Sequence, residues 1–254
     1  MPQNIPPVSP SILDDLVHAN RILYRREIVD GLGHVSARHD KDPSIYVLAA
    51  EKAPGRVTKE DLALFDLDSN ALTLTDRRPY VERFIHGEIY KARPDVQSVV
   101  HCHTPSLVAF CVCQVPLRPV YHMSGFLGRG VGRFEIRETA GMTDMLVSSP
   151  QLGKALARSL GDHQIVLMRG HGATIAGQTI KHSVFRANYA VQNALIQLDA
   201  MRMGEVTYLS DEEAMKSMEM NDRVVDRSWM LWKEEAFKPT LVRSARSRLP
   251  SGSG

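Results

Sequence analysis

The chain has few cysteines, no long apolar run and little net charge. Its three cysteines are an odd number among 254 residues, and its first residues lack the pattern of an export signal. We therefore expect a reduced, cytoplasmic protein without disulfides. No apolar run approaches the roughly 20 residues of a membrane span, which argues against a membrane partner. The net charge of +2 argues against a nucleic-acid partner.

The composition is that of an ordinary globular protein, with 43% apolar and 24% charged residues. A length of 254 residues suits one large domain or two small ones, and the chain contains neither an internal repeat nor a persuasive linker. Four prolines in the first ten residues predict an irregular N-terminal arm over residues 1–10. We expect one domain over residues 11–237 and a flexible, mildly basic tail over residues 238–254.

Apolar periodicity predicts both strands and helices along the chain. Predicted strands fall mainly in the first two thirds, at residues 34–38, 45–49, 62–68, 71–75, 96–103, 164–168 and 173–176. The segments 62–68 and 71–75 are expected to pair as a hairpin. Helices are predicted at residues 11–29, 81–92, from 105 onward, 151–160, 179–204 and 210–237. This order predicts an α/β fold, a single-domain sandwich in which helices flank a central, mostly antiparallel sheet.

Two histidines one residue apart, His101 and His103, follow a short apolar run. On a strand, residues i and i+2 point to the same face, so the two imidazoles would lie side by side. A third histidine, His171, follows another apolar run and stands between two glycines, which let the backbone approach a ligand closely. A carboxylate, Glu82, precedes the pair. Three imidazoles and one carboxylate are the donors of a catalytic centre for a divalent metal.

Each of these residues also has a structural interpretation. Buried or capping histidines are commoner than metal ligands, and Glu82 near a helix N-terminus would stabilise the helix dipole. The metal hypothesis depends on context, because both histidine segments stand where an apolar strand gives way to a turn. We expect Zn2+, although three imidazoles also suit Mn2+, Co2+ and Fe2+.

Several motifs resemble the class II aldolase and adducin family, which includes L-fuculose-phosphate aldolase and ribulose-phosphate epimerases. The resemblance extends over residues 11–204 and depends on the segments 33–38 (GHVSAR), 82–84 (ERF), 92–95 (ARPD), 100–103 (VHCH) and 171–172 (HG). It implies that His101, His103 and His171 bind a metal and that Glu82 is an acid/base residue. It also implies a single α/β domain that forms a homotetramer with active sites at subunit interfaces.

The residues that bind phosphate in the sugar-phosphate members of this family are replaced here. Those enzymes use a Gly-Asn pair, a Ser/Thr-Gly pair and two serines just before the glutamate. The matching positions of this chain hold Gly33-His34, the segment 47–50 (VLAA) and Tyr80-Val81. Phosphate binding needs several convergent N–H and O–H donors. Their joint loss indicates a flatter, less hydrophilic substrate than a phosphorylated sugar.

Residues 121–128 (YHMSGFLG) resemble the decarboxylase members of the family more than its aldolases. Those decarboxylases act on hydroxylated aromatic acids such as dihydroxyphthalate, or on ring-fission products such as hydroxy-carboxymuconic semialdehydes. At the position of His122 the aldolases carry a tyrosine that donates a proton across the subunit interface, and a histidine can do so near neutral pH. The alternative is that His122 only hydrogen bonds within a loop. Ser124 of the same segment is expected to bind substrate.

These features favour a metal-dependent decarboxylase of a small hydroxylated aromatic or ring-cleavage carboxylate. In this hypothesis the metal stabilises an enolate as CO2 leaves, Glu82 orients substrate or moves a proton, and His122 protonates the carbanion. His34, Ser36 and Arg38 line the former phosphate loop and are expected to bind a second carboxylate. The alternative for Arg38 is a solvent-facing side chain.

Three other functions stay open at this point. The first is an aldolase or epimerase acting on a sugar or sugar phosphate, which cleavage of a phosphorylated ketose would identify. The second is a non-catalytic, adducin-like interaction module, which would not need the ligand residues that this chain keeps. The third is an iron oxygenase, because three histidines and open positions also suit Fe2+, and oxygen consumption would identify it.

Overall fold

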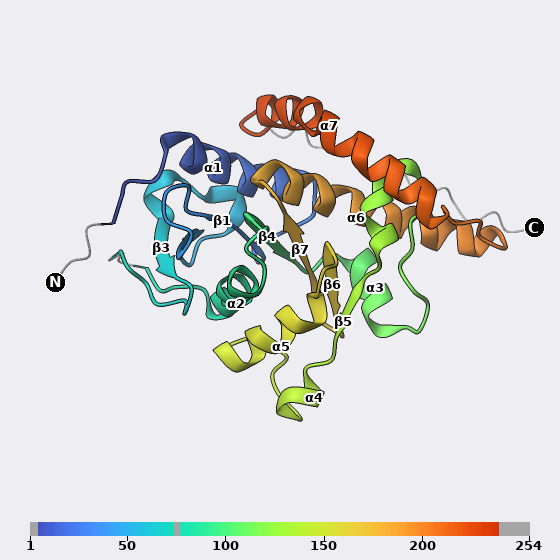
Figure 1. The fold of residues 1–254 in the computed structure, drawn as a ribbon, viewed down its shortest axis with the longest axis horizontal. Helices are drawn as coiled ribbons and strands as arrows, with labels where there is room; N and C mark the ends of the chain where they lie inside the picture. Colours follow the sequence, from blue (N-terminus) through green and yellow to red (C-terminus); the bar gives the residue numbers. More distant parts are fainter. Residues whose placement is uncertain (1–4, 74–76, 239–254) are drawn as a thin grey trace, which may run out of the picture.

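A computed structural model describes residues 5–73 and 77–238. Its centre is one sheet of seven strands in the order β3-β2-β1-β4-β7-β6-β5 (Figure 1). Every neighbouring pair is antiparallel except β5 and β6, which are parallel. The predicted α/β fold with a mostly antiparallel central sheet is therefore confirmed. The strands are β1 (His34–Arg38), β2 (Ile45–Ala49), β3 (Leu62–Asp66), β4 (Ser98–Cys102), β5 (Gly132–Phe134), β6 (Ile165–Met168) and β7 (Gly172–Gly177).

Helices cover both faces of this sheet. In Figure 1, α1 and α6 lie over one face with α7 outside α6, and α2 and α5 lie over the other face. The α-helices are α1 (Pro10–Arg25), α2 (Phe84–Ala92), α3 (Pro105–Val112), α4 (Arg137–Ala140), α5 (Pro150–Leu160), α6 (Ile180–Met203) and α7 (Asp211–Glu235). Four short 3₁₀ segments are Pro54–Arg56, Lys59–Asp61, Val81–Arg83 and His122–Arg129. The described residues thus form a large hydrophobic core on each side of the sheet.

Side chains alternate between the two faces of the sheet along β4, and this alternation determines on which face His101 lies. Val100 belongs to the core beneath α1 and α6, whereas Val99 belongs to the core formed with α2 and α5. Alternate residues of a strand share a face, so His101 lies on the same side as Val99. Glu82 stands just before α2, on that same side of the sheet.

Three helices begin at side-chain caps that the sequence carries. The hydroxyl of Ser149 accepts a hydrogen bond from the backbone N–H of Leu152 at α5, and Thr179 does the same for α6. At α7, Ser210 and Glu213 each accept from the other's backbone N–H, which is the predicted capping box. These bonds satisfy N–H groups that the first helical turn leaves without partners.

Two predicted elements differ from the structure, and one observed strand was not predicted. The helix predicted over residues 11–29 ends at Arg25, because Glu27 adopts a positive φ of 58° that a right-handed helix does not permit. The second arm of the predicted hairpin is not a strand: Ala71 forms an isolated bridge with Phe65, and residues 74–76 lie outside the described part of the chain. The three-residue strand β5 was not predicted, because so short a segment carries no clear alternation.

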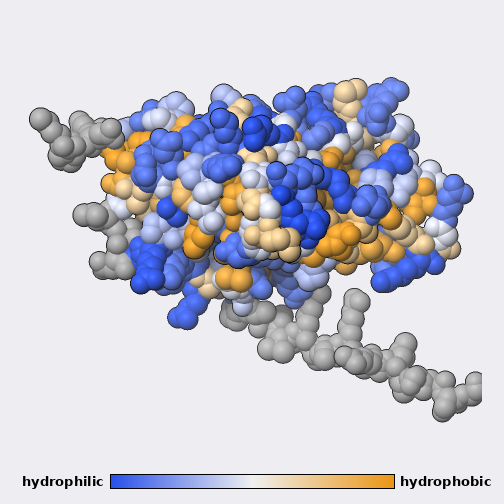
Figure 2. All heavy atoms as spheres, turned by 90° about the horizontal axis from the view of Figure 1, so that it is seen from below, coloured by the Kyte–Doolittle hydropathy of each residue, from blue (hydrophilic) through white to orange (hydrophobic). Residues whose placement is uncertain are grey.

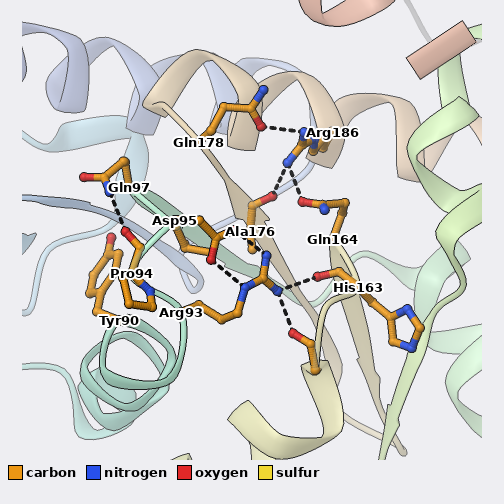
Figure 3. A network of polar contacts seen from close by, with 12 residues as sticks. Tyr90, Arg93, Pro94, Asp95, Gln97, His163, Gln164, Ala176, Gln178 and Arg186 are labelled. Atoms are coloured by element: carbon orange, nitrogen blue, oxygen red, sulfur yellow. Dashed lines mark hydrogen bonds and ion pairs between the residues drawn. The ribbon is translucent and has the colours of Figure 1, made fainter. Parts of the chain in front are cut away.

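Two arginines fasten the sheet at the end away from His101. Figure 3 shows Arg93, just after α2, donating to the carboxylate of Asp95 and to the carbonyl oxygens of Gly161 and His163. Arg186 of α6 is almost fully buried and donates to the carbonyl oxygen of Ala176 in β7. Charge-assisted bonds of this kind are stronger than neutral ones. Arg93 ties the turn before β4 to the turn before β6, and Arg186 ties α6 to β7, at the end of the sheet away from the histidines.

The surface is mixed in character. Figure 2 shows a face on which apolar side chains gather in patches among hydrophilic ones. Large exposed apolar side chains also occur along α6 and α7, including Leu195, Met203 and Met220. Within the described residues, no helix is both long and apolar enough to cross a membrane. The predicted homotetramer stays a prediction.

Candidate metal centre

Three imidazoles and one carboxylate converge beside the α2 face of the sheet. The Nε2 atoms of His101 and His103 lie 3.0 Å apart, and those of His103 and His171 lie 3.1 Å apart. Oε2 of Glu82 lies 3.5 Å from Nε2 of both His101 and His171. One donor atom from each residue falls within 4.8 Å of the others. The four residues singled out in the sequence therefore form one cluster.

The histidines reach the cluster from two neighbouring strands. His101 belongs to β4, and His103 follows it at the strand end. His171 occupies the tight turn between β6 and β7, and β7 pairs with β4. A Cβ on Gly172 would lie 2.1 Å from the carbonyl oxygen of Cys102. Only glycine permits this close approach, which brings His171 across to the histidines of β4.

In His171 and His101, the Nδ1 atom, which points away from the cluster, contacts a neighbouring oxygen atom. Nδ1 of His171 donates to the carbonyl oxygen of Met145 at 2.9 Å. Because a carbonyl only accepts, the neutral ring of His171 carries its proton on Nδ1 and presents a lone pair on Nε2. Nδ1 of His101 lies 3.2 Å from the hydroxyl of Thr174. Such contacts orient imidazoles that serve as metal ligands.

Glu82 is held by one oxygen and faces the histidines with the other. It lies in the 3₁₀ turn before α2, and its residue is only 8% exposed. Its Oε1 accepts a hydrogen bond of 2.9 Å from the backbone N–H of Val147. Its Oε2 stays within reach of His101 and His171.

The electrostatics of the cluster favour an ionised carboxylate. Burial opposes ionisation of Glu82, but hydrogen bonds and charge from His101 and His171 outweigh it and hold the pKa of Glu82 well below its usual range. Burial and the neighbouring rings of His101 and His171 lower the pKa of His103 to about 4. Burial also acts on His171, yet its hydrogen bond to Glu82 raises its pKa. An ionised carboxylate beside imidazole nitrogens attracts a cation.

The donor set and its spacing fit a divalent metal. Lone pairs of neutral imidazoles repel each other at 3 Å unless a proton or a cation lies between them. With a Zn–N bond of about 2.1 Å, two nitrogens on one ion lie about 3.0 Å apart at a right angle and about 3.4 Å apart at a tetrahedral angle. The observed 3.0 and 3.1 Å fall at the lower end of this range. His101, His103 and His171 can therefore hold one ion, with Glu82 as a further donor.

His34 borders the cluster through a chain of buried polar groups. Its Nδ1 shares a 2.6 Å hydrogen bond with Nε2 of His86, whose Nδ1 lies 2.6 Å from the hydroxyl of Ser36. That hydroxyl also lies 2.7 Å from the hydroxyl of Tyr90. Among the described residues, none hydrogen bonds to Nε2 of His34. Of the two predicted substrate-binding residues here, His34 keeps a nitrogen for a ligand, whereas the Ser36 hydroxyl is engaged within the fold.

The other two predicted substrate-binding residues are buried in internal contacts. All three guanidinium nitrogens of Arg38 donate to backbone carbonyl oxygens, and the residue is 6% exposed. It is therefore neither solvent-facing nor among the residues that line the cavity described below. Ser124 is fully buried, and its hydroxyl donates to Asn193 at 2.6 Å and to the carbonyl oxygen of Tyr121 at 2.9 Å. Ser124 is likewise absent from the residues that line this cavity.

His122 lies outside the metal cluster of its own chain. It opens the 3₁₀ segment His122–Arg129 and is exposed. Its carbonyl oxygen accepts a hydrogen bond of 2.7 Å from the side chain of Asn221 in α7. Its imidazole is thus presented on the surface.

A cavity of about 640 Å³ opens beside Glu82 and His103. This volume lies within the usual range for a small-molecule site. The lining residues are Gly31, Leu32, Gly33, His34, Glu51, Lys52, Ala53, Arg78, Pro79, Tyr80, Val81, Glu82, His103 and Leu146. The sequence analysis did not predict that the basic residues Lys52 and Arg78 belong to the site. Charged residues in loops are common, and no motif distinguishes these two.

Known proteins resemble this chain in sequence and in fold. The profile of the "Class II Aldolase and Adducin N-terminal domain" matches residues 14–198. "Decarboxylase tropJ" of Talaromyces stipitatus is 35% identical over 238 residues, which cover 84% of this chain and 90% of that protein. A "3,4-dihydroxyphthalate decarboxylase" of Rhodococcus jostii is 29% identical over 196 residues, which cover 74% of this chain and 80% of that protein.

A solved structure, "L-fuculose 1-phosphate aldolase" from Glaciozyma antarctica, superposes with a TM-score of 0.75. The match covers 91% of this chain and 93% of that one at 19% sequence identity. An identity this low shows a shared fold and nothing finer about the reaction.

Proposed function

Because the chain belongs to the class II aldolase and adducin family, we propose that it is a metal-dependent decarboxylase of a small hydroxylated aromatic or ring-cleavage carboxylate. The observation that carries this proposal is the cluster of His101, His103, His171 and Glu82 at the edge of a cavity without the family's phosphate-binding hydroxyls. Decarboxylase relatives support a lyase of this kind. The finer choices of Zn2+, a homotetramer and aromatic catabolism belong to the same proposal.

The reaction breaks one C–C bond of the substrate. CO2 leaves, the electron pair of the broken bond stays on the remaining carbon, and that carbon then takes up a proton. A divalent cation held by the three imidazoles would act as a Lewis acid toward the developing negative charge. The protein must supply the rest: orientation of the substrate, exclusion of water and a proton donor.

Glu82 and His34 are placed to orient the substrate. Oε1 of Glu82 is tied to Val147, so Oε2 is the atom that can accept a proton or hydrogen bond from a substrate hydroxyl. His34 lies on the cavity wall, stacked on Tyr80 with ring centroids 5.0 Å apart. Because His86 engages Nδ1 of His34, Nε2 is the atom that can contact substrate. An apolar wall beside these groups suits a flat, aromatic or unsaturated acid.

His122 is the proposed proton donor, and we assign it to the active site of a neighbouring subunit. Its exposure and its absence from the cavity of its own chain support this assignment. A ring nitrogen of the imidazolium would deliver its proton to the substrate carbon, and solvent would restore it. The assignment requires an oligomer, which agrees with the proposed homotetramer.

The test combines metal analysis with a substrate screen. The purified protein is assayed for bound metal and for CO2 release from dihydroxybenzoates, dihydroxyphthalates and their ring-fission products. Sugar phosphates are tested in parallel for aldol cleavage, and an oxygen electrode monitors oxygen uptake. CO2 release that a chelator abolishes and added metal restores is the expected result. Cleavage of a sugar phosphate without CO2 release would instead identify an aldolase, and substrate-dependent oxygen uptake an oxygenase.

A further inference from the structure

Two chain segments form one wall of the cavity and are tied together. Ala50 and Pro79 pair in an antiparallel bridge. The hydroxyl of Tyr80 donates to the carbonyl oxygen of Lys52, and the backbone N–H of Lys52 lies 3.3 Å from that hydroxyl oxygen. The residue before a proline is restricted to extended conformations, which further limits Arg78. Lys52 and Arg78 therefore sit on adjacent, constrained segments that line the same cavity.

The two side chains differ in how far their charges are paired among the described residues. The ammonium group of Lys52 forms a long ion pair with Asp61, 3.5 Å from its Oδ1. The same oxygen lies 3.1 Å from Arg77, and the other carboxylate oxygen accepts two bonds from Thr58. The guanidinium of Arg78 has no hydrogen bond or ion pair with any described residue. Lys52 thus shares the carboxylate of Asp61 with Arg77, and no residue in the described part of the chain pairs with Arg78.

The rest of the cavity is mostly apolar, which makes these cations stand out. Besides Glu82, one acidic side chain lines it, Glu51, and this residue is exposed. The apolar side chains that line it are those of Leu32, Ala53, Pro79, Val81 and Leu146. A ligand with an apolar body and an anionic group would match this arrangement.

We propose that Lys52 and Arg78 bind a second carboxylate of the substrate while its reacting end lies at the metal cluster. The preferred ligand class is then a flat dicarboxylate rather than a monocarboxylate. A guanidinium can form two parallel hydrogen bonds with a carboxylate, and an ammonium adds a point charge beside it. This inference rests on the proposed function, because it assumes that the reacting group binds beside Glu82 and His103.

Equilibrium binding tests this inference without any turnover. Isothermal titration calorimetry with the zinc-loaded protein compares benzoate with phthalate, isophthalate and terephthalate. At least one dicarboxylate is expected to bind about 10-fold or more tightly than benzoate, since a close ion pair is worth about this much. In the double variant Lys52→Ala/Arg78→Ala, that dicarboxylate is expected to bind no better than benzoate, because only the dicarboxylate loses a directly paired carboxylate.

Glu51→Gln is the matched control, since it removes a charge of opposite sign from the same cavity. It should leave the advantage of the dicarboxylate unchanged or increase it. Circular dichroism and the melting temperature verify that each variant is folded. Arg78→Lys keeps the positive charge but loses the paired N–H donors of the guanidinium, so it should retain part of the preference for the dicarboxylate. It provides a milder variant if the double variant is unstable.

Three results would overturn the inference. The first is a wild-type protein that binds no dicarboxylate better than benzoate, and the second is an advantage that survives in the double variant. The third is tighter binding of phenyl phosphate than of every dicarboxylate, lost in the double variant, which would assign the cations to phosphate. Failure to release CO2 from any acid in the activity screen, with this binding pattern intact, would contradict only the proposed reaction.

Discussion

The carbonyl oxygen of Met145 accepts a 2.9 Å hydrogen bond from Nδ1 of His171. This contact sets the protonated nitrogen of the ring and turns its Nε2 toward His103 and Glu82. It also links the loop before α5 to the cluster. Two residues further along this loop, the backbone N–H of Val147 donates a hydrogen bond to Glu82. One short loop thus orients both a nitrogen and a carboxylate of the candidate metal centre.

Removing one imidazole should empty the metal site. His101→Ala is expected to abolish metal binding and activity, because two histidines and Glu82 are a weaker set of donors than three and Glu82. Metal content by atomic emission and activity of the metal-supplemented protein provide the measurement. His163→Ala removes a histidine outside the cluster and should retain both properties. Full activity of a metal-free His101→Ala protein would contradict the site.

Neutralising the carboxylate should slow the reaction while the protein stays folded. Glu82→Gln keeps an oxygen that can accept from Val147 but removes the negative charge beside the imidazoles. We expect turnover to fall by about 10²–10⁴-fold, the usual contribution of an acid/base residue. The measurement is the steady-state rate with saturating metal. Glu60→Gln, an exposed acid outside the cavity, is the control, and equal rates for the two variants would exclude the role of Glu82.

His122→Ala should keep the metal and slow turnover by about 10²–10⁴-fold. Complementation then tests whether the residue acts across an interface. Subunits carrying His122→Ala are co-expressed with subunits carrying His101→Ala, and the mixed oligomers are purified with two different tags. Activity well above that of either variant is expected, because some sites then combine an intact cluster with an intact His122. Mixed oligomers as inactive as their parents would place His122 in its own subunit or outside catalysis.

Gly172→Ala should destabilise the protein. The new Cβ would lie 2.1 Å from the carbonyl oxygen of Cys102, so the turn that carries His171 must move. We expect a loss of about 1–3 kcal/mol in the free energy of unfolding, as for other overpacked sites. Gly31→Ala, where a Cβ meets nothing within 4 Å, is the matched control. Urea denaturation compares the two, and equal midpoints would contradict the close approach of β7 to β4.

Acid should weaken the metal-free protein well above the pKa of ordinary carboxylates. Burial lowers the pKa of His86 to about 3, whereas an unfolded histidine titrates near 6.5. Between these values the unfolded chain binds a proton that the folded chain does not, so stability falls as the pH drops from about 6.5 toward 3.

Melting temperatures of the metal-free protein measured from pH 7 to pH 4 test this expectation. The variant His86→Gln should melt lower overall, because Ser36 and His34 lose a partner, but its melting temperature should depend less on pH. His18→Gln serves as the control substitution. An unchanged pH slope in His86→Gln would assign the acid sensitivity to other groups.

The ligand cluster was predictable because its strongest part is local. Two histidines at i and i+2 on one strand must share a face, whatever the rest of the fold does. The recurrence of an apolar run before His171, and the family motifs around it, extended the prediction to a residue 68 positions further along the chain. The strands of the sheet were predictable for the same reason, since the apolar periodicity that indicates a strand lies within the strand's own residues.

The sequence could not show whether the side chains of Arg38 and Lys52 are buried in internal contacts or line the cavity. Both are basic residues near predicted strands, yet Arg38 is buried against carbonyl oxygens while Lys52 lines the cavity. A guanidinium pairs with whichever acceptors the fold brings near, and those of Arg38 come from residues up to 58 positions away. Ser124 is a similar case, because its partner Asn193 lies on the distant helix α6.

The sequence alone thus determined the kinds of secondary structure, the residues of the candidate metal cluster and the family. Those properties depend on periodicity and on short motifs, which neighbouring residues encode. Tertiary structure decided which polar side chains form internal hydrogen bonds and which ones line the cavity. That division depends on contacts between segments far apart in the chain, and the free energy of pairing a buried polar group is settled only when those segments meet.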